Sequence, residues 1–368
     1  MKLKVKILSM QRVKNHGSFL QSYALMKTLE LLGAEVSFLD IQKGLDNSHF
    51  AKSNKKEYKN NKKIDWFVNR VLMKFAAKKQ ATLFAQQSEQ HLRLLPTEMT
   101  VGNDCDLVVI GSDEVMNCAV TAKWGLSLQL FGNIPEAKRV VTYAASCGAT
   151  TYDDIPQKER TLIQNSLHCL SKISVRDKNT RLFIEKMLGK DSCCENLDPV
   201  LIYDFTPKII PCSFGKPFML VYSYPNRMTA PEEIQMIRQY AKKHHLEVVC
   251  AGVFQKWCKY NLPMTSFELL GYFKAAECVV TDTFHGSIMS IITHRKFATV
   301  IRNSNRNKLV DLLERLGLKG RICEDIHDLE KLMDVEIDYD AVDSIRNVER
   351  EKTKKYLKTT LTEASKQE

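Results

Sequence analysis

The chain has 368 residues, of which 44% are hydrophobic and 26% are charged, the balance of a globular protein with a hydrophobic core. Its 54 lysines and arginines outnumber its 43 aspartates and glutamates, and the resulting formal charge of +11 indicates an anionic partner. The length favours two domains. No apolar run is long enough for a membrane span. The 11 scattered cysteines fit neither a disulfide framework nor a zinc site and are typical of a reducing cytoplasm.

The first half of the chain alternates between strand and helix patterns. Its opening residues, 3–9, predict a strand rather than a secretory signal, because lysines interrupt the apolar positions. Further strands are predicted at 35–41, 106–111, 139–146 and 172–177, with helices at 18–32 and 156–170. Such alternation predicts a parallel sheet covered on both faces.

A second set of the same kind begins near residue 217. Strands are predicted at 218–224, 246–252, 278–281 and 297–301, and helices at 231–245, 265–276 and 307–316. A capping box, Thr229 to Glu232, is expected to begin the first of these helices.

The domain boundary is predicted within residues 197–217, which hold four prolines and little helical pattern. We therefore expect domains at 1–205 and 206–340, followed by a C-terminal helix in 341–368 that packs back on the first domain. Two domains of this kind place a cleft at the carboxyl ends of their strands, and functional residues are expected there.

The most informative strand end is the segment TDTFHGS, residues 281–287. Its polar side chains can cap a helix that starts near residue 286; they are Thr281, Asp282 and Thr283. The N–H groups of Gly286, Ser287 and Ile288 then form an anion site. His285 can donate a hydrogen bond to phosphate or transfer a proton near neutral pH. A capped helix with a packed histidine explains the pattern equally well.

Three further strand ends carry polar side chains. Ser112 and Asp113 follow the strand at 106–111, where Asp113 can accept a proton from a sugar hydroxyl or simply cap a helix. Asn15, His16 and Gly17 form a turn before the first helix, with Gln21 one turn later; a turn and cap also explain them. Arg176 ends the strand at 172–177 and can grip phosphate or carboxylate with two donors.

Taken together, these motifs resemble one family, the polysaccharide pyruvyl transferases. The family carries N-[YH]-G-x-x-L-Q-x-Y-A-L, G-S-D-x-x-W-N, S-Y-A-x-S-x-G, S-V-R-[DE], D-P and V-x-T-D-S-F-H-G. This chain matches them, in that order, at 15–25, 111–117, 142–148, 174–177, 198–199 and 279–286. Each motif is weak alone, but six in order are specific, and they cover roughly residues 5–320.

The resemblance implies an α/β fold of two Rossmann-like domains that face each other across a cleft, the GT-B type. It also implies transfer of the pyruvyl group of phosphoenolpyruvate onto two hydroxyls of a sugar, forming a ketal. The acceptor would be a cell-surface polysaccharide or its lipid-linked precursor. The protein would be cytoplasmic, and a lipid-linked precursor would bring it to the inner face of the membrane. No cofactor or metal is expected.

The implied roles divide between the two domains. His285 would be the acid or phosphate donor and Asp113 the base. The donor site would comprise Arg176, Asp282, Thr283, Gly286, Ser287, Arg302 and Arg306. The acceptor site would comprise Asn15, His16, Gly17, Gln21, Ser112 and Asn117.

Two departures from the family pattern keep alternatives open. Thr283 stands where better-characterised members have an arginine that holds phosphate, and Arg302 or Arg306 is expected to replace it. Met116 stands where many relatives have a tryptophan suited to sugar stacking. A nucleotide-sugar glycosyltransferase and a non-catalytic glycan- or anion-binding protein therefore remain alternatives. Nucleic-acid binding is not expected, because the basic residues are spread out.

Residues 52–80 form a basic segment with Ile64, Phe67, Val71 and Phe75 at helical spacing. A basic amphipathic helix can lie on an anionic membrane and bring the site to a lipid-linked acceptor. The same pattern suits a surface helix packed on the first domain, which general grounds favour, or a lysine-rich disordered loop before that helix.

Overall fold

The computed structural model describes residues 2–52, 66–94, 105–225 and 227–366, and for residues 66–73 it describes the backbone alone. The chain divides into two compact units. Unit 1 comprises Met1–Lys56, His91–Tyr203 and Arg346–Glu368, and unit 2 comprises Glu57–Gln90 and Asp204–Ile345.

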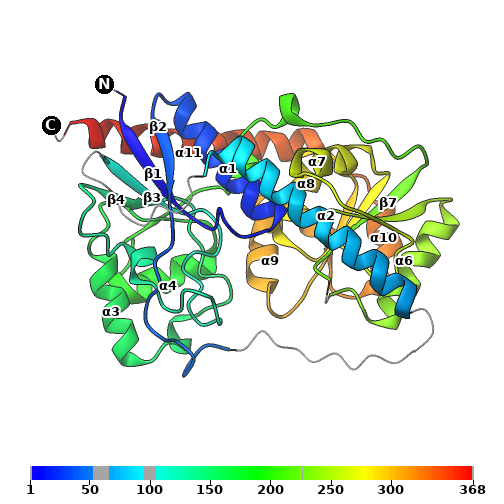
Figure 1. The fold of residues 1–368 in the computed structure, drawn as a ribbon, viewed down its shortest axis with the longest axis horizontal. Helices are drawn as coiled ribbons and strands as arrows, with labels where there is room; N and C mark the ends of the chain where they lie inside the picture. Colours follow the sequence, from blue (N-terminus) through cyan, green and yellow to red (C-terminus); the bar gives the residue numbers. More distant parts are fainter. Residues whose placement is uncertain (1, 53–65, 95–104, 226, 367–368) are drawn as a thin grey trace. The chain divides into compact units, whose positions relative to one another are not determined.

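Unit 1 is built on a parallel four-stranded sheet in the order β2-β1-β3-β4 (Figure 1). Its strands are β1 (Lys4–Leu8), β2 (Glu35–Leu39), β3 (Leu107–Ile110) and β4 (Val140–Thr142), and a separate parallel pair is β5 (Ser174–Val175) and β6 (Cys194–Glu195). Parallel bridges join Ala145 to Asp113 and to Val175. The helices lying wholly in this unit are α1 (His16–Leu31), α3 (Gln157–Leu167), α4 (Lys178–Leu188) and α5 (Pro199–Ile202).

Unit 2 contains a parallel six-stranded sheet in the order β12-β11-β10-β7-β8-β9. The strands are β7 (Phe218–Tyr222), β8 (Glu247–Ala251), β9 (Tyr260–Leu262), β10 (Cys278–Thr281), β11 (Phe297–Val300) and β12 (Ile322–Cys323). Its helices include α6 (Pro231–Lys243), α7 (Ser266–Ala275), α8 (Phe284–Ile292), α9 (Arg306–Arg315) and α10 (Leu329–Asp334). Strands β7 and β10 are buried along their whole length, as expected of parallel strands covered on both faces.

Helix α2 (Trp66–Leu92) is grouped with unit 2 up to Gln90, although its sequence lies between segments of unit 1 (Figure 1). The amide of Gln80 donates to the Met264 carbonyl at 2.7 Å and accepts from the Met264 N–H at 3.0 Å. The side chain of Gln87 accepts from the Ser266 N–H at 2.7 Å. Two buried glutamines therefore attach α2 to the segment that begins α7.

This grouping corrects two sequence-based expectations. The first domain was predicted to run unbroken from 1 to 205, and a helix in 52–80 was expected to pack on it if it did not lie on a membrane. The pairing partner of Gln80 is 184 residues away, so no local pattern reveals it. The lysine-rich stretch 53–65 and the side chains of 66–73 lie outside the described residues, and membrane contact through them stays a prediction.

Helix α11 (Tyr339–Ser365) is divided between the units, with the residues from Arg346 onward in unit 1. The Tyr356 hydroxyl donates to the carbonyl of Thr142 at 2.8 Å, and the Thr353 hydroxyl accepts from the Leu197 N–H at 3.4 Å. Near its other end, Asp343 pairs with His294 at 3.0 Å. The predicted C-terminal helix is therefore present, and its later part packs on unit 1.

The predicted strands and helices occur in the predicted order. The expected capping box at Thr229 is wrong: α6 begins at Pro231 with Ala230 as its N-cap and no side-chain cap bond. Proline suits the first helical position, which leaves Thr229 outside the helix. The segment 197–217, predicted as a linker, begins with the short helix α5, which Asp198 caps and which belongs to unit 1.

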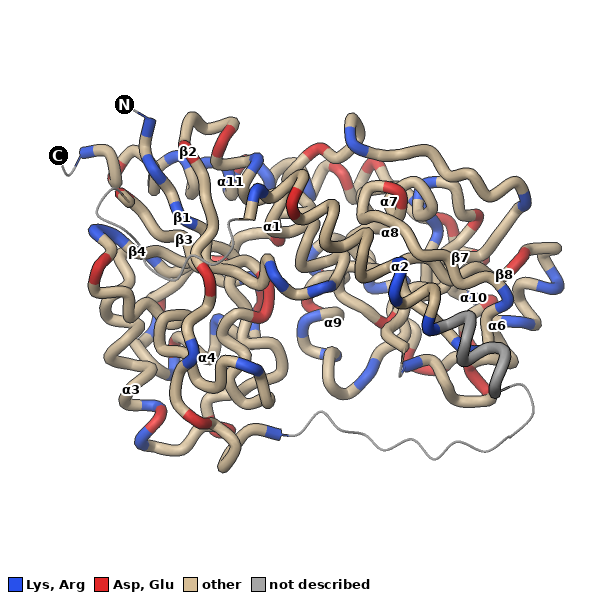
Figure 2. The backbone as a smooth tube through the Cα atoms, in the orientation of Figure 1, with Lys and Arg blue, Asp and Glu red and all other residues tan. Residues whose placement is uncertain are grey.

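Charged residues of both signs are interspersed along the described chain (Figure 2). No helix among the described residues is long and apolar enough to cross a membrane. All 11 cysteines are free thiols, and seven of them are buried.

Candidate functional site

The start of α1 in unit 1 is fixed by Asn15, whose side chain accepts a hydrogen bond from the Gly17 N–H at 2.8 Å. His16 and Gly17 are the first two helical residues, and both are buried. The predicted turn and cap are therefore present.

Gln21, one turn into α1, is fully buried below this turn. Its amide nitrogen donates to the hydroxyl of Ser9, at 2.9 Å, and to that of Ser22, at 2.8 Å. The Ser9 hydroxyl donates in turn to the carbonyl of Ser112 at 3.1 Å. Gln21 and Ser112 thus join α1 to the ends of β1 and β3. Because both are buried, they position this edge of the sheet rather than present themselves at its surface.

Asp113 is partly exposed at the carboxyl end of β3. One carboxylate oxygen accepts from the Ser18 hydroxyl at 2.8 Å, and the other from the N–H of Glu114 at 2.9 Å. Its backbone has a φ of 75°, a left-handed conformation that costs energy outside glycine. The two hydrogen bonds hold this partly exposed carboxylate in place at the carboxyl end of β3.

Asn117 extends this polar surface. Its amide donates to a Glu114 carboxylate oxygen at 2.7 Å, and its carbonyl accepts from the Thr150 hydroxyl at 2.8 Å. Glu114 and Asn117 are partly exposed, whereas Met116 between them is fully buried in the core of unit 1. The residue at position 116 therefore offers no stacking surface here, and the Glu114 carboxylate is a polar group that the sequence motif did not identify.

Arg176 lies at the end of β5, but its guanidinium is turned into the protein. Only 3% of its side chain is exposed, and it donates to Asp198 at 2.9 Å. The Ser112 hydroxyl donates to the same Asp198 oxygen at 3.3 Å. Burial lowers the pKa of Arg176, but Asp198 and nearby carboxylates outweigh this effect and raise it above its ordinary value. The structure shows Arg176 as part of a buried ion pair, a contact that sequence reasoning missed.

In unit 2, α8 begins two residues earlier than the sequence suggested, at Phe284 with Thr283 as its N-cap. The Thr283 hydroxyl accepts from the Gly286 N–H at 2.9 Å, and the Thr283 carbonyl accepts from the Ser287 N–H at 3.1 Å. The expectation that these two N–H groups are available to an anion is therefore wrong. Threonine is a good N-cap, and by capping at 283 it moves the first helical turn to residues 284–286.

The first turn of α8 packs tightly on the end of β10. A Cβ atom on Gly286 would collide with the Thr281 and Thr283 hydroxyls, so only glycine fits there. Ser287 is fully buried, with its hydroxyl 2.9 Å from that of Thr299 on β11. His285 is 91% buried at the second helical position, beside the first-turn N–H groups.

Asp282 connects β10 to α8 and is fully buried. Its Oδ2 accepts from Nε of Arg302 at 3.2 Å, whereas its Oδ1 has no hydrogen-bond partner among the described residues. Burial raises the pKa of this carboxyl above its ordinary value, against the opposing effects of Arg227, the Ser223 hydroxyl and Arg302. A carboxylate is thus held inside a cluster of cations.

Arg302 follows β11 and bridges two carboxylates, those of Asp282 and Glu233. Its third nitrogen, Nη2, is buried and has no hydrogen-bond partner in the described part of the chain. Arg306 has a different environment: it is exposed and pairs with Glu324 at 2.6 Å. Of the two arginines expected to replace the missing one at position 283, the structure brings Arg302 to the start of α8.

A second arginine reaches the same point from the other side. Arg227, in the loop after β7, directs its guanidinium to the Asp282 carbonyl at 3.4 Å. Asn305 donates to that carbonyl at 2.6 Å. No sequence pattern marked Arg227, because its loop has no hydrophobic periodicity; its place in the loop that follows a buried strand was the only signal.

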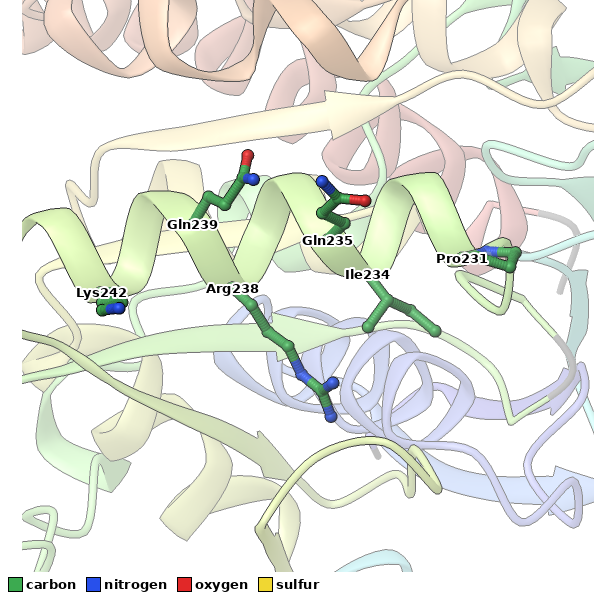
Figure 3. Close-up of a pocket in the computed structure, with 6 residues that line it drawn as sticks. All are labelled: Pro231, Ile234, Gln235, Arg238, Gln239 and Lys242. Atoms are coloured by element: carbon green, nitrogen blue, oxygen red, sulfur yellow. The ribbon is translucent and has the colours of Figure 1, made fainter. Parts of the chain in front are cut away.

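The residues predicted to form the site thus fall into two clusters, each at the carboxyl edge of one parallel sheet. Unit 1 gathers the residues predicted for the acceptor, with Asp113 and Arg176; unit 2 gathers the residues around Asp282 and His285. A hollow of about 280 Å³ elsewhere in unit 2 is lined by one face of α6, including Ile234 and Arg238, and includes none of these residues (Figure 3).

The fold and the two clusters define an α/β protein whose polar groups gather at the ends of parallel strands. The family model described as polysaccharide pyruvyl transferase matches residues 15–305, and the chain belongs to this family. The protein is therefore a transferase. A search of curated proteins finds no match.

Solved structures show weak similarity over nearly the whole chain. A UDP co-structure of MnaA from S. aureus is 11% identical, with 91% of this chain and 89% of that chain covered and a TM-score of 0.48. A UDP-GlcNAc 2-epimerase from Methanocaldococcus jannaschii is 11% identical, with 95% and 99% covered and a TM-score of 0.48. The glycosyltransferase SnogD from Streptomyces nogalater is 11% identical, with 99% and 100% covered and a TM-score of 0.44. The predicted cleft between the domains stays a prediction.

Proposed function

We propose that the protein transfers the pyruvyl group of phosphoenolpyruvate onto two hydroxyls of one sugar in a surface polysaccharide or its lipid-linked precursor. The observation that carries the proposal is the cluster at the start of α8. There Arg302 has an unpartnered buried nitrogen next to Asp282, and His285 lies in the first helical turn. Cations and a helix N-terminus suit the phosphate and carboxylate of this donor.

The chemistry requires one proton donor, one proton acceptor and stabilisation of phosphate. Protonation of the donor's methylene carbon gives an oxocarbenium-like centre, to which the first sugar hydroxyl adds. The C–O bond to phosphate then breaks, and the second hydroxyl closes the ketal. The proton lost by the first hydroxyl balances the proton added to the methylene carbon. The proton lost by the second hydroxyl leaves with phosphate.

Three side chains take these roles in the proposal. His285 supplies the proton or a hydrogen bond to the leaving phosphate, and Arg302 binds that phosphate. Asp113 accepts the proton of the attacking hydroxyl, since its carboxylate is partly exposed and held in place by Ser18. We place this reaction in the cytoplasm, with no cofactor beyond the donor.

Replacement of His285 tests the proposal. We expect His285→Ala to fold, with a cooperative thermal transition, and to lose transfer by about a hundred- to ten-thousandfold, the usual contribution of a positioned acid or base. The assay measures phosphate release from phosphoenolpyruvate and ketal formation on a glycan by NMR. His168→Ala is the control, because His168 is exposed at the end of α3. A fully active His285→Ala variant would refute the assignment.

A nucleotide-sugar glycosyltransferase is the alternative, and the same protein preparation distinguishes the two. Thermal protection by phosphoenolpyruvate supports the proposal, whereas protection by a nucleotide sugar alone overturns it.

A further inference from the structure

Two arginines approach the same residue from opposite sides of one strand. In the sheet of unit 2, β10 lies between β7 and β11. Arg227 follows β7 and Arg302 follows β11, and both reach Asp282 at the end of β10. Because neighbouring strands are about 4.8 Å apart, side chains from the two outer strands can contact two groups of one small ligand.

The guanidinium groups of Arg302 and Arg227 differ in the contacts that they make within the protein. Arg302 is held by two carboxylates, and its remaining buried nitrogen has no partner among the described residues. Among the described residues, Arg227 donates to the Asp282 carbonyl at 3.4 Å, lies near the Asp282 carboxyl and lies 5.2 Å from the Tyr224 ring, on a partly exposed loop. Arg302 therefore has one donor to offer beside the first turn of α8, whereas Arg227 can still present two parallel donors to a planar anion.

We propose that Arg227 binds the carboxylate of the donor while Arg302 and the start of α8 bind its phosphate. Arg227 is then the residue that selects an enolpyruvyl phosphate over phosphate compounds that lack a carboxylate. The inference rests on the proposed function, which it deepens by assigning the donor's second anionic group. It also gives this chain two arginines at the donor site, although Thr283 occupies the position where relatives have one.

Calorimetric titration of the full chain tests this assignment with three probes: phosphoenolpyruvate, inorganic phosphate and UDP. Arg227→Met keeps the length of the side chain and removes its charge. We expect phosphoenolpyruvate to bind this variant about ten- to a hundredfold more weakly, because a charge-assisted contact is lost. Phosphate should bind it within about twofold of the wild type.

Arg160→Met is the matched control. Arg160 also lies over a tyrosine ring, that of Tyr152 at 4.3 Å, and donates to a carbonyl, but it belongs to α3 of unit 1. It should bind all three probes like the wild type. Arg227→Lys is the second variant if Arg227→Met folds poorly, and it should also bind phosphoenolpyruvate more weakly, since an ammonium cannot offer two parallel donors.

The outcomes separate the two proposals. If the wild type binds phosphoenolpyruvate and Arg227→Met binds it equally well, the role of Arg227 is wrong and the proposed function stands. An equal loss of phosphate and phosphoenolpyruvate binding also overturns the selective role. If the wild type binds UDP but no phosphoenolpyruvate, the proposed function fails and this inference fails with it.

Discussion

Replacing Gln80 with methionine should loosen α2 from unit 2. The side chain is 94% buried, and methionine has a similar length but none of the hydrogen-bonding groups. The variant leaves both the N–H and the carbonyl of Met264 without their partner. Each unpaired buried group costs about 1–3 kcal/mol, so the expected loss of stability is about 2–6 kcal/mol.

Gln87→Met is a reference against which the loss of stability in Gln80→Met can be compared. Gln87 accepts one hydrogen bond, from the Ser266 N–H, and its own Nε2 is buried with no partner among the described residues. The replacement loses one bond and also removes one unsatisfied donor. Its cost should therefore be well under half that of Gln80→Met.

The assay is amide hydrogen exchange read by mass spectrometry on peptides covering 262–276 and 78–92, at increasing urea. Local exchange is preferred because a chain of two units need not unfold in one transition. Gln86→Met is the control, since Gln86 is exposed on the same helix and should change stability by less than about 0.5 kcal/mol. If Gln80→Met behaves like Gln86→Met, these hydrogen bonds do not hold α2, and its assignment to unit 2 has another cause.

Two further predictions concern ion pairs in unit 1. Arg176→Met should lower the stability of unit 1 by about 3–5 kcal/mol, because Asp198 would remain buried without its cation. Amide hydrogen exchange on peptides of unit 1, at increasing urea, measures this loss, and a value under about 1 kcal/mol would contradict it. Glu363 has a pKa below its ordinary value because Lys172 donates a hydrogen bond to it, with Lys172 and Arg139 adding attraction. The stabilisation that the Glu363 carboxylate gives to the folded protein is therefore present above its unfolded-state pKa, and it is lost as the pH falls through its folded-state pKa. Glu363→Gln should lose no more than about 1 kcal/mol near pH 7 and match the wild type in acid, and a difference that grows in acid would show the sign to be wrong.

Much of the fold was predictable because parallel strands in a covered sheet have local signatures. Strand β10 was placed correctly at 278–281, since its β-branched run ends at polar residues. The start of α8 was misplaced because the sequence offers three capping side chains, and only the structure shows that Thr283 is used. Arg176 was recognised at a strand end, but its burial depends on Asp198, which a sequence pattern does not connect to it. Arg227 was missed for a similar reason, because the contact that defines it spans 55 residues.

The division of the chain between the units has a consequence for synthesis on the ribosome. Unit 1 is assembled from three separated stretches, and its bonds to Thr353 and Tyr356 cannot form until the chain beyond residue 346 has emerged. Helix α2 likewise waits for residues 264–266, made long after it. Consecutive domains fold one after another as they are made, but neither unit of this chain can complete its folding before the later segments have been synthesised. A nascent chain released after residue 205 would therefore expose both the face of unit 1 that α11 covers and the glutamine-bearing face of α2, making it a substrate for chaperones and proteases.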